Sequence, residues 1–303
     1  MDSIGVWKLV SIFTTLLAAI LGIWISFYFR KSKFFTIGCA IASGVLLATG
    51  LTHSLPEGVE GLESWSSDYL NGYPFAYLLA ALSIGFLALL EEGIHSYFEH
   101  KHQPAICEHG PELDAESQAE VPKEQESLQE NHHHHIHPDA LTETSAVFVF
   151  LALSIHAILE GMATGAASDV DGLYGTLIAI LIHKGLAAFA LGASLVEAEV
   201  ATYRLILYGG IFSLGTPIGI IIGWLGSLGE DSAGIFGGIA NSLAAGTFIY
   251  VSTMEFMPLT FKSNRDRFLI KALMFIIGFT LMAILPIWSD VHDHGELDDG
   301  HDH

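Results

Sequence analysis

The chain has 303 residues, of which 51% are hydrophobic and 15% charged, and its mean hydropathy is +0.49. These values exclude an ordinary soluble domain, in which about 25% of residues are charged. The formal net charge of −21 argues against nucleic-acid or anionic-lipid partners and favours the attraction of cations.

The apolar residues lie in blocks that are long enough to cross a bilayer. A helix needs about 20 apolar residues to span roughly 30 Å of hydrocarbon. Two blocks, 144–168 and 172–196, have this length but contain ionisable residues. The sequence therefore predicts an all-α, polytopic membrane protein with eight transmembrane helices. The other six blocks contain no Lys, Arg, Asp or Glu and comprise residues 9–29, 34–52, 69–90, 205–229, 232–254 and 272–289.

The spans divide the chain into four parts. Residues 1–97 hold helices 1 to 3, and residues 143–289 hold helices 4 to 8. Residues 98–142 are polar, acidic and rich in histidine, which predicts a cytoplasmic, mostly disordered loop. Residues 290–303 form an acidic, His-bearing extracellular tail. The acidic stretch that begins at Glu57 predicts a shorter loop between helices 2 and 3.

The basic residues predict the orientation, because membrane insertion keeps Lys and Arg of short loops on the cytoplasmic side. With eight spans and both termini extracellular or lumenal, ten of the twelve basic residues face the cytoplasm. The two exceptions are Lys8, near the outer face, and Lys184, within a span. Removing one span would scatter the charges over both sides, so this asymmetry also supports the span count.

Two adjacent spans, helices 4 and 5, carry ionisable side chains near the middle of the membrane. His156 and Glu160 are four residues apart and share one helix face, and His183 and Lys184 lie in the next span. At about 1.5 Å per residue, His156 and His183 lie at nearly the same height. Two imidazoles and a carboxylate suit a borderline divalent ion such as zinc. The alternative is that these groups only form hydrogen bonds between helices.

The sequence around these residues resembles the paired signature of the ZIP (Zrt/Irt-like) metal transporters. The resemblance implies that His156, Glu160 and His183 are the metal-site residues of a transport pathway, and that the protein is a homodimer. The matching segments are His156-Ala-Ile-Leu-Glu160-Gly-Met-Ala-Thr-Gly165, His183-Lys184-Gly-Leu-Ala-Ala-Phe-Ala-Leu-Gly192, Ser43-Gly-Val-Leu-Leu-Ala-Thr-Gly50, Thr216-Pro217-Ile-Gly219 and Leu243-Ala-Ala-Gly-Thr-Phe-Ile-Tyr-Val251.

The chain departs from the family pattern at one position. Many members carry a carboxylate four residues after the histidine of helix 5, where this chain has Ala187. The consecutive His183 and Lys184 resemble the branch of animal zinc importers. We therefore expect the Lys184 ammonium, beside Glu160, to take the place of a second cation.

Other ionisable residues suggest a route on either side of this site. His53 and Glu57, at the outer end of helix 2, are candidates for the pathway entrance. Glu91, His95 and Glu255, in the inner halves of helices 3 and 7, are candidates for the exit. The loop histidines are candidates for weak metal buffering, with a tolerated low-complexity insertion as the alternative. These loop residues are His132, His133, His134, His135 and His137.

These features together predict a transporter that moves Zn²⁺ into the cytosol, in the plasma membrane or, as the alternative, in the membrane of an organelle. The same ligands suit Fe²⁺, Mn²⁺ and Cd²⁺, and the ion is the substrate, with no prosthetic group expected. One alternative is an intramembrane zinc metallohydrolase, which needs a retained metal and a general base. His-Glu-x-x-His is absent from the sequence. The second alternative is a metal-gated receptor or channel.

Overall fold

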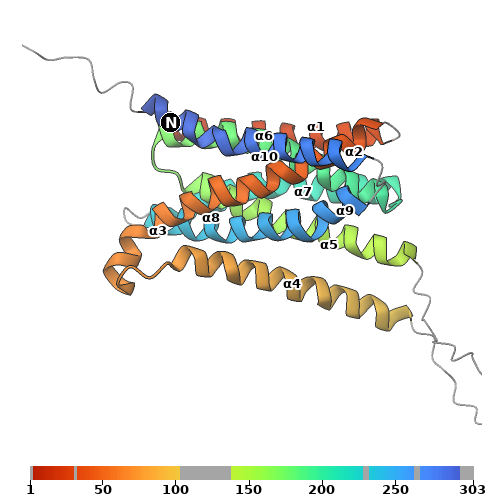
Figure 1. Ribbon diagram of the computed structural model, residues 1–303. Helices are drawn as coiled ribbons and strands as arrows, with labels where there is room; N and C mark the ends of the chain where they lie inside the picture. Colours follow the sequence, from red (N-terminus) through yellow and green to blue (C-terminus); the bar gives the residue numbers. More distant parts are fainter. Residues whose placement is uncertain (1–2, 31–32, 103–137, 228–231, 263–266, 294–303) are drawn as a thin grey trace, which may run out of the picture.

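The computed structural model describes residues 3–30, 33–102, 138–227, 232–262 and 267–293. Within these ranges every regular element is a helix, and eight helices are long and apolar enough to cross a membrane. The predicted all-α membrane architecture and its eight spans are therefore confirmed. The start of α1 and the end of α10 lie at the same end of the bundle, at the left of Figure 1.

The elements follow one another with short connections, apart from the segment between α4 and α5. In chain order they are α1 (Ser3–Phe29), α2 (Lys33–Thr49), the π-helical segment η1 (Gly50–Ser54), α3 (Leu55–Leu70), α4 (Phe75–His102), α5 (Pro138–Ala166), α6 (Val170–Glu197), α7 (Thr202–Gly226), α8 (Ser232–Tyr250), the π-helical segment η2 (Val251–Phe256), α9 (Met257–Lys262) and α10 (Phe268–Asp293).

The acidic stretch after the second span is a helix, so the predicted loop there is wrong. Residues 35–70 form one continuous helix through α2, η1 and α3. The helix persists because one face of α3, with Gly58, Leu62 and Ser66, is buried. Gly58 lies so close to α8 that a Cβ there would meet the Ser242 hydroxyl. Tertiary packing thus keeps a polar segment helical.

Two prolines that suggest helix ends instead follow π-helical segments. Pro56 comes after η1, and Pro258 comes after η2, and in both places the helix continues. Proline has no N–H and cannot complete the regular hydrogen-bond ladder, so the helix accommodates it by changing its local period. Such π segments often occur at functional sites. Here η1 carries His53 and η2 carries Glu255.

We assign the helices to two groups, α1, α5, α6 and α7 in the first and α2, α3, α4, α8 and α10 in the second, and the two groups are in close contact, since α8 packs on α5 as extensively as on α4. In the first group, α5 packs extensively on α7, and α1 packs on α6 and α7. In the second group, α2 packs on α10, and α8 packs on α3 and α4. The groups meet mainly where α5 contacts α8 and where α2 contacts α6. Figure 1 shows α4 at the lower edge, away from α1.

Close packing of α5 on α7 fixes the height of the candidate site. A Cβ added to Gly161 would overlap the backbone carbonyl of Thr216, and one added to Gly219 would overlap the carbonyl of Ile158. The two backbones therefore approach as closely as small residues permit. This packing brings the Thr216 side chain to Glu160, which immediately precedes Gly161.

Candidate metal centre

His156 and Glu160 on α5 and His183 on α6 come together in the interior. One donor atom from each residue lies within 4.8 Å of the others. All three side chains are buried. We call these three residues the central cluster. The predicted juxtaposition of two imidazoles and one carboxylate from adjacent helices is therefore present.

The ring of His156 is held by α8. Its Nδ1 lies 3.2 Å from the Ala244 carbonyl and 2.9 Å from the Thr247 hydroxyl. Thr247 itself donates to the Ala244 carbonyl at 2.6 Å, so both oxygens are arranged to accept a proton from Nδ1. This pattern assigns the proton to Nδ1 and leaves the Nε2 lone pair free. Nε2 is buried, has no hydrogen-bond partner within the described ranges, and lies 3.8 Å from Glu160 Oε1.

His183 contacts the same carboxylate from the other helix. Its Nε2 faces Glu160 Oε1, while its Nδ1 is buried without a hydrogen-bond partner among the described residues. The ring of Phe248 stacks on His156, with centroids 3.4 Å apart, and meets the His183 ring edge-on at 5.5 Å. Phe248 therefore fixes both ring planes and excludes water from one side of the cluster.

Lys184 lies on the opposite side of Glu160, so the predicted position of its ammonium beside this carboxylate is present. Its Nζ is 3.4 Å from Glu160 Oε2 and 2.5 Å from the Thr216 hydroxyl. It also sits 4.5 Å from the centroid of the Phe212 ring. The Thr216 hydroxyl is 3.2 Å from Glu160 Oε2, so Thr216 links the two charged groups. One carboxylate oxygen thus faces the imidazoles and the other faces the ammonium.

His53 and Glu57, the predicted entrance residues, lie next to the central cluster. His53 Nδ1 is 3.2 Å from Glu57 Oε1, and the His53 ring centroid is 6.1 Å from that of His183. Glu57 also accepts from Asn241 at 3.0 Å and from Thr176 at 3.3 Å. Thr176 is on α6 and Asn241 is on α8, so Glu57 connects the two helix groups at this point.

Two of the predicted exit residues form a second cluster. Glu91 on α4 and Glu255 on η2 lie within hydrogen-bonding reach of each other. Tyr250 donates to Glu91 at 2.6 Å, and Ser145 donates to Glu255 at 2.7 Å. We call the two carboxylates the Glu91–Glu255 pair. The third predicted residue, His95, is half-buried one turn from Glu91, and its Nε2 has no hydrogen-bond partner among the described residues.

Sequence reasoning missed the polar residues that support the ligands. Thr216 belongs to the Thr216–Gly219 segment, and Thr247 and Tyr250 belong to the Leu243–Val251 segment, both of which match the family signature, but the contacts of these residues were not predicted. Asn241 lies in the apolar block of α8 outside these segments and carried no local signal. The candidate buffering residues His132, His133, His134, His135 and His137 lie outside the described residues, as do residues 294–303 of the predicted tail.

The arrangement is suited to bind a borderline divalent cation. Two neutral imidazoles and a carboxylate supply three ligands, and the orienting contacts of His156 resemble those that metal-ligating histidines generally make. The other ionisable side chains beside the cluster are the Lys184 ammonium on one side and the His53–Glu57 pair on the other.

Comparison with known proteins supports the same interpretation. The family model described as ZIP Zinc transporter matches residues 5–286. Zinc transporter ZIP1 of Danio rerio is 30% identical over 265 residues, which cover 84% of this chain and 85% of that protein. Zinc transporter ZIP2 of Mus musculus is 27% identical over 283 residues, covering 84% and 85%. Fe(2+) transport protein 1 of Arabidopsis thaliana is 25% identical over 303 residues, covering 93% and 85%.

Proposed function

The chain belongs to the ZIP zinc transporter family, and on that premise we propose that it carries Zn²⁺ into the cytosol through the central cluster. Zinc is the substrate, and the similarity to an Fe(2+) transport protein extends the candidate substrates to Fe²⁺. Family membership places the chain among transporters rather than among metallohydrolases.

One observation carries the assignment of the site. His156 Nε2 is a buried nitrogen without a hydrogen-bond partner in the part of the chain that the structure describes, and it lies 3.8 Å from Glu160 Oε1, which His183 Nε2 also contacts. A network that served only to hold helices together would satisfy such an atom, because an unpaired buried polar group costs about 1–3 kcal/mol. An open nitrogen beside a buried carboxylate and a second imidazole is better explained by a cation that passes between them. Neutral imidazoles and a carboxylate replace part of its hydration shell.

Lys184 sets the charge of this site. With both imidazoles neutral, the Glu160 carboxylate and the Lys184 ammonium cancel, so one divalent ion raises the local charge to +2. A second ion in the place of the ammonium would meet no additional carboxylate, since Ala187 stands where many family members have one. We therefore assign one metal ion per passage to the central cluster.

The positions of the residues suggest how the ion moves. The ligands His156, Glu160 and His183 belong to the group of α1, α5, α6 and α7. The entrance residue His53 and the Glu91–Glu255 pair belong to the other group. Movement of one group past the other would carry the ligands from the His53 side toward the Glu91–Glu255 pair, as alternating access requires. Glu57, which bonds to both groups, would separate from Thr176 or from Asn241 in this step.

The remaining assignments complete the proposal. Both termini face outside, the segment 98–142 lies in the cytoplasm, and its histidines buffer zinc after passage. The protein works as a homodimer in the plasma membrane. The common position of the α1 start and the α10 end supports an even number of crossings, as both termini on one side require.

Uptake of radiolabelled zinc into vesicles of purified protein tests the proposal. His156→Ala, Glu160→Ala and His183→Ala should each lower uptake by more than about 100-fold, because loss of a mere supporting group already costs metal sites about 10- to 100-fold. Glu92→Ala, at an exposed glutamate of α4, is the matched control and should leave uptake unchanged. Wild-type uptake by the three ligand variants, with the protein intact, contradicts the assignment.

The same vesicles separate the alternatives. A carrier saturates with zinc concentration, whereas a metal-gated channel gives non-saturating, voltage-driven currents. A metallohydrolase would retain zinc through purification and cleave a lipid or peptide. Either result would replace the transport proposal.

A further inference from the structure

His156, one of the three ligands, is oriented by a helix of the other group. Its Nδ1 lies 3.2 Å from the Ala244 carbonyl and 2.9 Å from the Thr247 hydroxyl, and both residues belong to α8. The Phe248 ring, also on α8, stacks on the imidazole. Each of these contacts crosses from the group of α5 to the group of α8. The orientation of this ligand therefore depends on how the two groups are placed.

The Glu160 carboxylate, in contrast, is supported from within its own group. Lys184 Nζ on α6 lies 3.4 Å from Oε2, and the Thr216 hydroxyl on α7 lies 3.2 Å from the same oxygen. The Thr216 hydroxyl is also 3.0 Å from the Ala157 carbonyl of α5. A movement of α5, α6 and α7 as one body would carry all of these contacts along with Glu160.

The contacts of α8 with α3 and α4 are too close to slide. A Cβ added to Gly246 of α8 would lie 2.3 Å from the Ala80 carbonyl of α4, and Gly58 of α3 approaches α8 in the same way. Ser83 of α4 donates to the Leu243 carbonyl of α8 at 2.8 Å. Helix α8 is thus interlocked with α3 and α4, as α5 is with α7, and we expect α8 to stay with its own group.

The contact between α5 and α8 is extensive but less close. Gly237 of α8 faces α5, and a Cβ there would lie 3.7 Å from the Ala166 Cβ, which is an ordinary van der Waals separation. An interface with such spacing lets one helix move along the other without a clash between backbones. The His156 contacts lie on this interface, so the same movement would break them.

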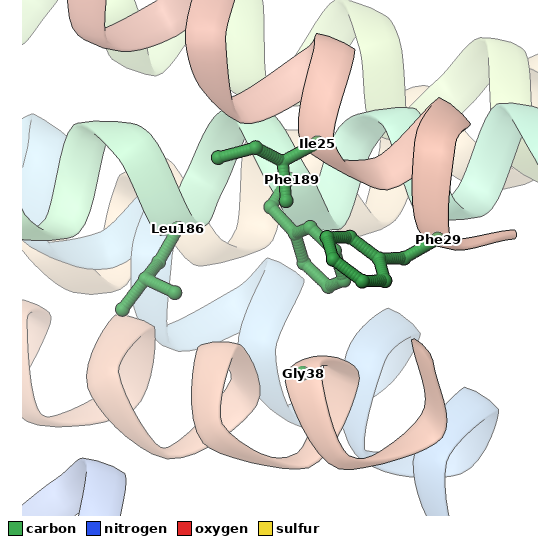
Figure 2. A pocket seen from close by; sticks show the side chains of 5 residues that line it. All are labelled: Ile25, Phe29, Gly38, Leu186 and Phe189. Carbon is green, nitrogen blue, oxygen red and sulfur yellow. The ribbon is translucent and has the colours of Figure 1, made fainter. Parts of the chain in front are cut away.

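The second contact between the groups, where α2 meets α6, is incompletely packed. Figure 2 shows Phe189 of α6 above Gly38 of α2, with Phe29 of α1 beside it. A crevice of about 430 Å³ remains there, whereas protein interiors leave few voids larger than a water molecule. Movement between the groups therefore disturbs less packing at this contact than movement within either group would.

We propose that Thr247 and the Ala244 carbonyl are positioning groups that make zinc affinity depend on the position of the ligand group. In the position seen here they hold the His156 ring with Nε2 toward Glu160, and the cluster binds zinc tightly. When α5 moves along α8, His156 loses both oxygens while Glu160 keeps its own support. Affinity falls and zinc is released. This inference rests on the proposed transport function and adds the cause of release.

Zinc exchange by the full chain in proteoliposomes, measured separately from the outer and the cytoplasmic side, tests the proposal. The wild type should have the lower KM at the outer side. Thr247→Val should raise the outer KM by about 10-fold, as expected for a group that supports a metal ligand, and leave the cytoplasmic KM unchanged. Thr247→Ser keeps the hydroxyl and should restore the outer KM. A merely structural role would lower the amount of folded protein without changing one KM alone.

Thr216→Val is the matched comparison, because this buried threonine supports a ligand from within the moving group. It should raise the KM on both sides by the same factor. An equal rise on both sides for Thr247→Val would mean that its support travels with the ligands, and an unchanged outer KM would mean that it gives none. Either result overturns the proposal.

A disulfide across the α5–α8 contact measures affinity in one position only. Ala166→Cys and Gly237→Cys, in a chain whose Cys39 and Cys107 are replaced by alanine, place two Cβ atoms at the 3.7 Å that suits a disulfide. Oxidation should stop uptake, and reduction should restore it. Zinc titration of the oxidised protein should show the full loss of about 10-fold for Thr247→Val. Wild-type uptake by the fully oxidised protein would overturn sliding at this contact.

The outcomes separate this proposal from the transport proposal. Absence of zinc uptake by the wild type would refute transport itself. Wild-type transport together with an equal change of both KM values in Thr247→Val would refute the positioning role alone. If Thr247→Val does not fold, Thr247→Ala removes the same hydroxyl, and uptake by the oxidised cross-linked protein still decides whether α5 slides along α8.

Discussion

The central cluster and the Glu91–Glu255 pair both hold carboxylates between helices, but they balance negative charge in different ways. Glu160 faces two imidazoles on one side and the Lys184 ammonium on the other. Among the described residues, the hydrogen-bond donors to Glu91 and Glu255 are the neutral hydroxyls of Tyr250 and Ser145. The central cluster therefore has a fixed positive counter-charge, the Lys184 ammonium, beside its ligands. The hydroxyl donors of the Glu91–Glu255 pair supply no such counter-charge.

This difference suggests separate tasks for the two clusters. A binding site must discriminate between ions, and nitrogen ligands in a fixed geometry serve that purpose. A release site must draw the ion onward and hold it weakly, and a partly hydrated carboxylate pair serves that purpose. The predictions below change the charge or the support of one cluster at a time, in order of decreasing expected effect.

Replacing Lys184 by glutamate makes the central cluster resemble the Glu91–Glu255 pair. The variant places a second carboxylate beside buried Glu160, and loss of one partner of a buried ion pair costs about 3–5 kcal/mol. We expect a large fall in the thermal midpoint without zinc, recovery of the midpoint on adding zinc, and two zinc ions bound per chain instead of one. Thermal unfolding and metal analysis measure both effects.

The control for this variant is Lys8→Met. Lys8 is also a buried lysine of the membrane region, but it lies over the Trp224 ring, away from Glu160. We expect unchanged zinc stoichiometry in this variant. Lys184→Glu with one bound zinc and wild-type metal selectivity would show that the ammonium does not stand in for a second cation.

Thr247→Val removes support from one ligand of the central cluster. The His156 Nδ1 proton loses the Thr247 hydroxyl but keeps the Ala244 carbonyl at 3.2 Å. We expect zinc affinity to fall by about 10-fold, the low end of the range for such supporting groups. Zinc titration of the purified protein measures the change. Thr15→Val, at a buried threonine that bonds to the Ser11 carbonyl of α1, should leave affinity unchanged.

Glu255→Gln weakens the charge of the Glu91–Glu255 pair. Ser145 can still donate to the amide oxygen, so the local hydrogen bond is retained while one ionisable group that could bind the cation is lost. We expect zinc turnover to fall by about fivefold, equivalent to roughly 1 kcal/mol, with zinc affinity of the central cluster unchanged. Saturation curves for uptake separate the two quantities. A change in affinity with unchanged turnover would place Glu255 at the binding step instead of the release step.

The parts of the central cluster differ in how far the sequence predicts them. The spacing of His156 and Glu160 is local, and so are the lengths of the apolar blocks, so both could be read directly. The contacts of Thr216 and Thr247 join residues 56 and 91 positions apart, and only the packing of α7 and α8 on α5 creates them.

The helix boundaries failed for a related reason. The acidic stretch that begins at Glu57 predicted a loop after the second span, because its polar residues do not favour a membrane helix. The structure keeps them helical through the π segment η1 and through packing of α3 on α8. Such packing depends on Ser242, far along the chain, and carries no local signature near Pro56.

The salt bridge between Arg204 and Glu143 separates the effect of burial from the effect of charge. Arg204 Nη1 lies 2.5 Å from Glu143 Oε1, closer than Lys184 Nζ lies to Glu160. However, its side chains are 44% and 48% exposed, compared with 1% and 7% for the buried pair. Exposed pairs are screened by water and contribute about 0–1 kcal/mol.

We expect Arg204→Gln to shift the thermal midpoint least of all these variants and to leave zinc uptake unchanged. Unfolding and uptake at low and high salt provide the measurement, since added salt should remove even the small shift. A loss comparable to that of Lys184→Glu would mean that charge pairing itself, rather than its burial beside the ligands, distinguishes the central cluster.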